Sequence, residues 1–134
     1  MYKILPFLLL SILLVSCKNI NNSRKDAEEI ESFQSFREKF YSDTAFQKDR
    51  ILFPLPGINS DDMDIDDSIY FWEKDKWKFL SDFSLIYGIN KETTKSDTSI
   101  LEKMYLPESG FIVNTEFILK TDEWFLKRLD ISNL

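Results

Sequence analysis

The stretch of sequence that decides the fold class is FIVNTEFILKTDEWFL, residues 111–126. Every second position from 111 to 119 carries a residue suited to the buried face of a strand, namely Phe111, Val113, Thr115, Phe117 and Leu119. Residues 121–123 then form a polar turn, and residues 124–131 can return beside the first strand, although their hydrophobic period is mixed. We therefore predict an antiparallel hairpin near the carboxyl end of the chain.

Two helices are predicted before the strands. Hydrophobic residues at spacings of three and four place one arc of a helix in the core, up to Tyr41. The residues of this arc are Ile30, Phe33, Phe36 and Phe40. Ser23 and Asp26 resemble a capping box at the helix start, and Asp43 can cap a short second helix that carries Phe46.

The middle of the chain predicts short strands and polar loops. Alternation over 51–55 indicates a strand, with Pro54 confining it to an edge or ending it early, and Pro56–Gly57 stopping it. Further strands are expected at 69–72 and 99–106, loops at 58–68 and 88–97, and an aromatic-rich segment of undetermined type at 77–87. Two helices followed by antiparallel strands predict an α+β fold, with the helices covering one face of the sheet.

The amino terminus reads as an export signal. Lys3 precedes an apolar run of 12 residues, 4–15, which is too short to span a bilayer but has the length of a signal-peptide core. The run ends in Leu-Val-Ser-Cys17, which resembles the lipobox of bacterial lipoproteins. The alternative is an ordinary export signal with an incidental cysteine.

The lipobox resemblance implies cleavage before Cys17 and acylation of its sulfur with palmitate-like chains. The predicted organisation is then a signal peptide at 1–16, a lipidated cysteine and tether at 17–24, and one domain at 25–134. Because Lys18 stands where aspartate often signals inner-membrane retention, we expect a lipid anchor in the cell envelope, at the outer membrane. Which side of that membrane the domain faces stays open.

Composition excludes several classes of function. The chain of 134 residues has no histidine, one cysteine, and three glycines outside any Gly-x-Gly array. These counts exclude imidazole chemistry, a disulfide or catalytic thiol in the mature domain, and glycine-rich phosphate loops, so no cofactor is expected. Without Lys3 the chain has 16 basic and 23 acidic residues, a net charge of −7, which opposes nucleic acid as a partner.

Two stretches resemble a family of uncharacterised exported bacterial lipoproteins, assigned to the nuclear-transport-factor-like, or cone-fold, superfamily. The first stretch comprises residues 36–40 with Asp43, Phe46, Gln47, Arg50, Ile51, Phe53, Pro54 and Leu55. The second is the hairpin from Phe117 to Leu126, where a polar turn precedes Trp124. The resemblance implies a strongly curved antiparallel sheet whose helices close a conical pocket. It implies no activity, since the superfamily includes enzymes, transport adaptors and binding modules.

The spacing of acids in and after the loop at 58–68 suggests the hypothesis of a calcium site. Counted from Asp62, the acids Asp64, Asp66 and Glu73 occupy the third, fifth and twelfth positions of an EF-hand loop. Asp67 stands where that loop needs glycine, and prolines occupy the place of the entering helix. We therefore interpret residues 58–68 as a solvated acidic loop and expect no bound metal.

Carboxylates and tyrosines can transfer protons without histidine when burial raises a carboxyl pKa. Candidates for such an enzyme are Asp82, Tyr70, Tyr87 and Tyr105, but no catalytic motif matches them. We therefore expect a lipid-anchored, non-enzymatic binding module for a small apolar ligand or an envelope protein. Arg50, Tyr87 and Tyr105 are the candidate ligand-binding residues. Arg50 alternatively offsets the dipole at the end of the second helix.

Overall fold

The computed structural model describes residues 29–64 and 66–133. The predicted signal peptide, Cys17 and the tether lie outside the described residues. The fold is α+β, with two short helices, α1 (Phe33–Phe40) and α2 (Thr44–Asp49), followed by six strands and a 3-10 turn, η1 (Phe83–Leu85). The strands are β1 (Leu55–Asn59), β2 (Tyr70–Trp72), β3 (Asn90–Lys95), β4 (Ser99–Tyr105), β5 (Phe111–Lys120) and β6 (Glu123–Asn133).

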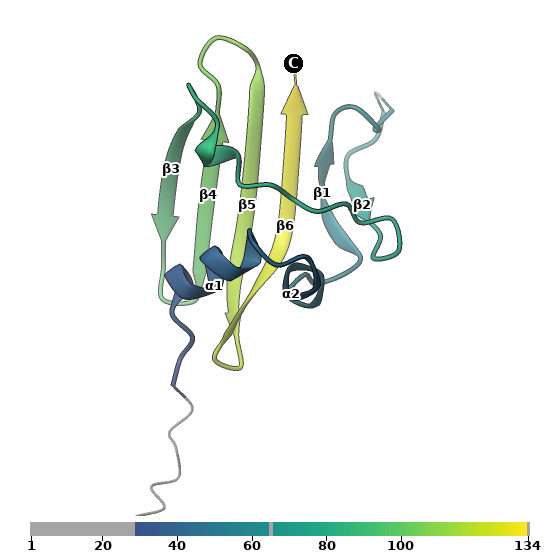
Figure 1. Ribbon diagram of the computed structural model, residues 1–134. Helices are drawn as coiled ribbons and strands as arrows, with labels where there is room; N and C mark the ends of the chain where they lie inside the picture. The colour runs from purple at the N-terminus through teal and green to yellow at the C-terminus, as the bar shows by residue number, and fades with distance from the viewer. Residues whose placement is uncertain (1–28, 65, 134) are drawn as a thin grey trace, which may run out of the picture.

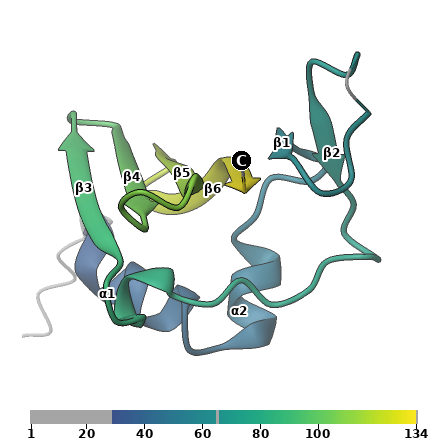
Figure 2. The same ribbon diagram turned by 90° about the horizontal axis from the view of Figure 1, so that it is seen from above.

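All six strands form one sheet in the order β2-β1-β6-β5-β4-β3. Neighbours are antiparallel except β1 and β6, which run parallel. Figures 1 and 2 show that the sheet curls around α1 and α2, so that both helices lie on its concave side. Within residues 29–64 and 66–133, no helix is long and apolar enough to cross a membrane.

The hairpin of β5 and β6 confirms the central sequence prediction. Its turn consists of Thr121 and Asp122, both at positive φ, between the paired residues Lys120 and Glu123. A β-bulge shifts the register after Glu116, and Lys127 is the residue of β6 that has no partner. An extra residue reverses which positions face inward. The bulge therefore explains the mixed hydrophobic period of the closing strand.

The core lies between α1 and the concave face of the sheet. Phe36, Phe40 and Phe117 are fully buried, and their rings contact one another at centroid distances of 5.3–5.6 Å. Phe33 and Trp124 pack against this centre. The helical arc predicted from Phe33, Phe36 and Phe40 is therefore correct.

The predicted arc was too long at its start. Ile30 is exposed, and α1 begins only at Phe33. Glu31, two residues before α1, is held against the β5–β6 turn, because its N–H donates to the carbonyl of Asp122 and its side chain accepts from the N–H of Trp124. These contacts hold Glu31 outside the helix.

The first strand also differs from its prediction. Ile51 forms only an isolated parallel bridge to Leu126, and β1 starts after Pro54, which has no N–H to donate. Pro56 and Gly57 lie inside β1 instead of ending it. Gly57 pairs with Leu129 of β6, and a Cβ at this position would collide with the carbonyl group of Leu129. Glycine therefore permits the close approach of the two parallel strands.

The predicted loop at 88–97 contains β3, an edge strand whose six residues are all exposed. Because neither face is buried, no hydrophobic alternation marks it. The undetermined segment at 77–87 has almost no regular structure. We call residues 73–82, which join β2 to η1, the strap. It runs across the concave side of β6 and β5 in Figure 1.

Candidate functional site

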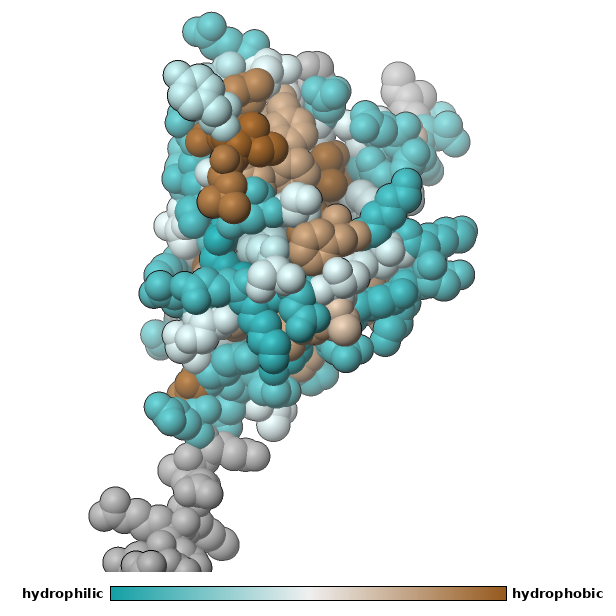
Figure 3. All heavy atoms as spheres, viewed as in Figure 1, coloured by the Kyte–Doolittle hydropathy of each residue, from teal (hydrophilic) through white to brown (hydrophobic). Residues whose placement is uncertain are grey.

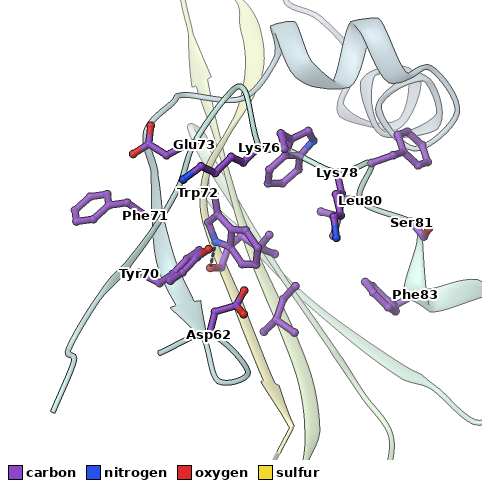
Figure 4. Close-up of a pocket in the computed structure, with 14 residues that line it drawn as sticks. Asp62, Tyr70, Phe71, Trp72, Glu73, Lys76, Lys78, Leu80, Ser81 and Phe83 are labelled. Carbon is purple, nitrogen blue, oxygen red and sulfur yellow. Dashed lines mark hydrogen bonds between the residues drawn. The ribbon is translucent and has the colours of Figure 1, made fainter. Parts of the chain in front are cut away.

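A cleft of about 430 Å³ opens between the strap and the outer strands of the sheet. Figure 4 shows its two sides, with β2 opposite the strap and β6 as the floor. Six aromatic residues line it, namely Tyr70, Phe71, Trp72, Trp77, Phe79 and Phe83. Leu80, Leu129 and Ile131 add aliphatic surface. The volume and the apolar lining are those of small-molecule sites.

Neighbouring rings fix the aromatic wall in place. Trp72 packs edge-to-face on Tyr70 at 4.8 Å and on Trp77 at 6.0 Å, and Trp77 packs on Phe53 at 5.5 Å. The indole N–H of Trp72 donates to the carbonyl of Leu129 at 3.4 Å. The wall is thus held by contacts within the protein and presents aromatic surface to the cleft.

Four charged side chains also line the cleft: Asp62, Glu73, Lys76 and Lys78. Asp62 accepts a 2.6 Å hydrogen bond from the side-chain amide of Asn59. Figure 4 shows Glu73 pointing away from the cleft centre, Lys76 reaching from the strap across Trp72, and Lys78 on the strap side. Among the described residues, neither lysine has a carboxylate within ion-pair distance.

Gln47 of α2 holds the strap in place. Its side chain is fully buried and makes four hydrogen bonds. Nε2 donates to the carbonyls of Phe40 and Leu80, both at 2.9 Å, while Oε1 accepts from the N–H of Leu80 at 2.8 Å and from the indole of Trp77 at 3.1 Å. Two of the strap's cleft-lining residues are therefore positioned by one amide.

Arg37 of α1 fixes the far end of the strap. Its guanidinium forms two hydrogen bonds with Asp82, at 2.7 and 3.0 Å, and two with the buried Glu102 of β4, at 2.9 and 3.0 Å. Lys91 lies 3.5 Å from Glu102 and adds a second positive charge. Two inward-facing carboxylates are thus held by one arginine, which links α1, the strap and the sheet.

The pKa values around Arg37 follow from this geometry. Partial burial alone would raise the pKa of Asp82, but hydrogen bonds from Arg37 and Ser84 outweigh burial and hold that pKa below its usual value. Burial would lower the pKa of Arg37, and the two carboxylates raise it instead. Burial and the nearby charge of Glu102 both raise the pKa of Tyr41, whose hydroxyl lies beside this cluster. At neutral pH Asp82 is therefore ionised and Tyr41 is neutral.

The structure does not bring the three predicted ligand-binding residues together. Arg50 follows α2 and pairs with Glu31 at 2.8 Å and with Glu123 at 2.7 Å, so it joins the helix end to the β5–β6 turn. Tyr105 ends β4 and donates from its hydroxyl to Glu92. Tyr87 follows η1 and is fully solvent-exposed. None of the three lines the cleft.

The predicted enzyme residues are also dispersed, since Tyr70 lines the cleft and Asp82 is bound to Arg37 outside its lining. Within the acidic loop, Asp64 donates its backbone N–H to Asp67, and Asp62 and Glu73 lie at the cleft. Asp66 is exposed. In residues 29–64 and 66–133, no group of three potential ligand side chains is arranged to hold a metal ion.

A second surface feature lies beside η1. Leu85 is 83% exposed, Ile86 is 52% exposed, and Leu106 of the β4–β5 connection is also exposed. Figure 3 shows hydrophobic residues gathered over η1 and the adjoining end of the sheet. We call Leu85, Ile86, Tyr87 and Leu106 the η1 patch. Phe83, which lines the cleft, precedes Leu85 in the chain, so the patch begins next to the cleft.

Sequence reasoning missed Gln47, Arg37 and Glu102 as organising residues and Lys76 and Lys78 as cleft residues. Arg37 and Gln47 both belong to the stretch that carried the family resemblance, which was the one available signal. From the local sequence alone, an arginine or glutamine on a short helix is interpreted as part of its solvent-exposed face.

Comparisons with known proteins define the family of the chain. A protein-family model described only as "-like" matches residues 31–127, which is most of the chain and all of the buried hydrophobic core except Leu129. A search of curated proteins finds no match.

Three solved structures from Bacteroides resemble the fold. A cystatin-like protein from Bacteroides caccae is 24% identical with a TM-score of 0.55, covering 75% of each chain. An NTF2-like protein from Bacteroides fragilis is 20% identical with a TM-score of 0.58, covering 81% of this chain and 48% of its own. A protein from Bacteroides uniformis is 23% identical with a TM-score of 0.52, covering 78% of each chain. At these identities the likeness establishes the fold alone.

Proposed function

Because the chain belongs to the family whose model matches residues 31–127 and its fold is similar to those of an NTF2-like and a cystatin-like protein, we propose that it is a non-enzymatic binding module that retains a small apolar or aromatic molecule in the strap cleft. The observation that carries this proposal is the preorganised wall of Tyr70, Trp72 and Trp77 around a cleft of about 430 Å³. Aromatic rings already fixed in place require little ordering when a ligand binds.

The pairing of the interior carboxylates with Arg37 favours binding of a ligand over its chemical conversion. Asp82 and Glu102, the acids that face the interior, are both bound to Arg37. A general acid needs a raised pKa, and the Arg37 pair lowers that of Asp82. The candidate tyrosines lie on separate elements. The two interior carboxylates are therefore held in ion pairs with Arg37, and neither of them lines the cleft.

The proposal includes a lipid anchor. Cleavage before Cys17 and acylation of that cysteine would hold the domain at the outer membrane of the cell envelope, with the described domain following a short tether. Two or three acyl chains anchor a protein durably, whereas one gives reversible binding. Loss of labelled-palmitate incorporation in Cys17→Ser tests the anchor. Continued labelling of that variant would refute it.

A thermal-shift screen with apolar and aromatic compounds tests the cleft. A ligand at about 100 times its dissociation constant should add about 2.7 kcal/mol of stability. Trp72→Ala should abolish the shift, while Tyr87→Ala, outside the cleft, should preserve it. If no compound shifts the transition, or if shifts survive Trp72→Ala, the cleft is not the binding site.

The η1 patch supports a second candidate, the binding of an envelope protein. Figure 1 shows η1 at the opposite end of the sheet from the start of the described chain, so a domain tethered by its amino terminus would direct the patch away from its anchor. Exposed apolar residues that gather in one place are typical of interaction surfaces. Crosslinking in intact cells from a photoreactive residue at position 87 tests this candidate, with position 74 as the control.

A further inference from the structure

We propose that the strap cleft selects organic anions: molecules with a flat apolar body and one negatively charged group, which Lys76 and Lys78 receive. The inference rests on the proposed function, in that it takes the cleft to be the ligand site, and it adds the chemical class of the ligand. The apolar body would lie against the aromatic wall, and the charged group would lie at the strap.

The local charge of the cleft contrasts with that of the whole protein. The chain has a net charge of −6, so its overall field repels anions. Lys76 and Lys78 nevertheless line the cleft without a described carboxylate partner, whereas Arg37, Arg50 and Lys91 are all engaged in ion pairs. The two lysines are therefore available to a ligand.

The acids of the cleft are placed differently from the lysines. In Figure 4, Asp62 lies at the end of the cleft away from Lys76 and Lys78, and Glu73 points away from the cleft centre. Lys76 extends from the strap toward β2 in Figure 4 and lines the same cleft as Tyr70 and Trp72. An anionic group on a ring that packs against this wall would meet Lys76 or Lys78, and a cationic group in the same place would be repelled.

Two fluorescent dyes test the inference directly. Anilinonaphthalene sulfonate and N-phenylnaphthylamine share the same aromatic rings and differ in the sulfonate, so their ratio of dissociation constants isolates the charge. We expect the sulfonate to bind the purified protein about tenfold more tightly at low ionic strength, which corresponds to about 1.4 kcal/mol. Because added salt screens exposed charges, the preference should shrink as ionic strength rises from about 0.01 M to about 1 M.

Matched variants locate the effect. Lys76→Gln combined with Lys78→Gln should reduce the preference below about twofold and leave the affinity for the neutral dye unchanged. Lys74→Gln, in the same turn but outside the cleft, should leave both affinities unchanged, and so should Leu85→Ser in the η1 patch. Urea unfolding midpoints confirm that each variant is folded.

The outcomes separate the two proposals. If both dyes bind equally, or if the sulfonate preference survives the double lysine variant, anion selection is wrong while a ligand-binding cleft stands. If neither dye binds, or if binding is lost in Leu85→Ser and kept in Trp72→Ala, the cleft is not a binding site and both proposals fail.

Discussion

Replacing Gln47 by leucine should release the strap from α2. Leucine fills most of the same volume and keeps the apolar contacts, but it removes all four hydrogen bonds of the amide. The carbonyl of Phe40 and both backbone groups of Leu80 would then be buried without this partner, and the indole N–H of Trp77 would also lose it.

The magnitude follows from the burial of these partners. Leaving a buried polar group unsatisfied costs about 1–3 kcal/mol. Three backbone groups lie at this fully buried side chain, while the indole of Trp77 is partly exposed and can reach water. Movement of the strap would relieve part of the cost at Leu80. We therefore expect Gln47→Leu to lose about 3–5 kcal/mol of unfolding free energy, which is a large share of the stability of a small domain.

Urea unfolding followed by tryptophan fluorescence measures the global loss, and amide exchange of Leu80 measures opening of the strap. The matched control is Gln34→Leu on α1, because Gln34 is exposed and its amide makes a single bond to Glu38. An exposed substitution of this kind should change stability by less than about 0.5 kcal/mol. A loss below about 1 kcal/mol in Gln47→Leu, with Leu80 exchanging as slowly as in the parent, would refute the reasoning.

A second variant tests the same contacts through pH. In Gln47→Glu, one carboxyl oxygen would face the carbonyls of Phe40 and Leu80, so the folded state would favour the protonated acid and raise its pKa above the ordinary value of about 4.3. A raised folded pKa gives stability that is present below the ordinary pKa and is lost as pH rises through the folded pKa. This variant should therefore be more stable relative to the parent at acidic pH than at neutral pH.

Three further changes test the core, the Arg37 cluster and the hairpin turn. Phe36→Ala should cost about 3–5 kcal/mol of unfolding free energy in urea, since this ring is fully buried among other aromatic rings, whereas Phe71→Ala, at a half-exposed position, should cost far less. Arg37 lowers the pKa of Asp82, so the stability that Asp82 contributes is present above its ordinary pKa of about 3.9 and is lost as pH falls. The difference in unfolding free energy between the parent and Asp82→Asn should therefore shrink toward acidic pH. A difference that grows toward acidic pH would contradict the pairing of Arg37 with Asp82. Thr121→Asn should raise stability by about 0.5–1 kcal/mol in thermal unfolding, because a β-branched residue at φ 48° is strained and asparagine tolerates the left-handed region. An unchanged midpoint would show that the backbone at Thr121 is not strained.

The parts of the fold that the sequence predicts correctly are those with a buried face. In β5 and in the helix that carries Phe33, Phe36 and Phe40, one side faces the core, and this leaves a periodic hydrophobic pattern in the local sequence. β3 has no buried face, so its sequence resembles a loop, and only its hydrogen bonds to β4 define it as a strand. Gly57 was interpreted as a strand terminator because its role depends on Leu129, 72 positions further along the chain.

The cleft was less predictable than the fold for the same reason. Gln47 meets Leu80 across 33 positions, and Arg37 meets Glu102 across 65. No short-range pattern reports such pairs, since a polar residue that organises the interior and one that faces water have the same local spacing. Aromatic residues are concentrated in and around the strap, and six of them line the cleft. Tyr87 and Tyr105 do not line the cleft, and nothing in the sequence shows which way a tyrosine in a loop or at the end of a strand faces.

The contact between Gly57 and Leu129 also bears on how relatives of this chain can be sorted. Any side chain at position 57 would occupy the space of the Leu129 carbonyl, and no substitution elsewhere can remove a backbone carbonyl. A homologue with alanine or a larger residue at the aligned position must therefore have separated its first and last strands, which would displace the wall that carries Tyr70 and Trp72. The residue at position 57 would thus divide the family into members that can form this cleft and members whose binding site, where they have one, lies elsewhere.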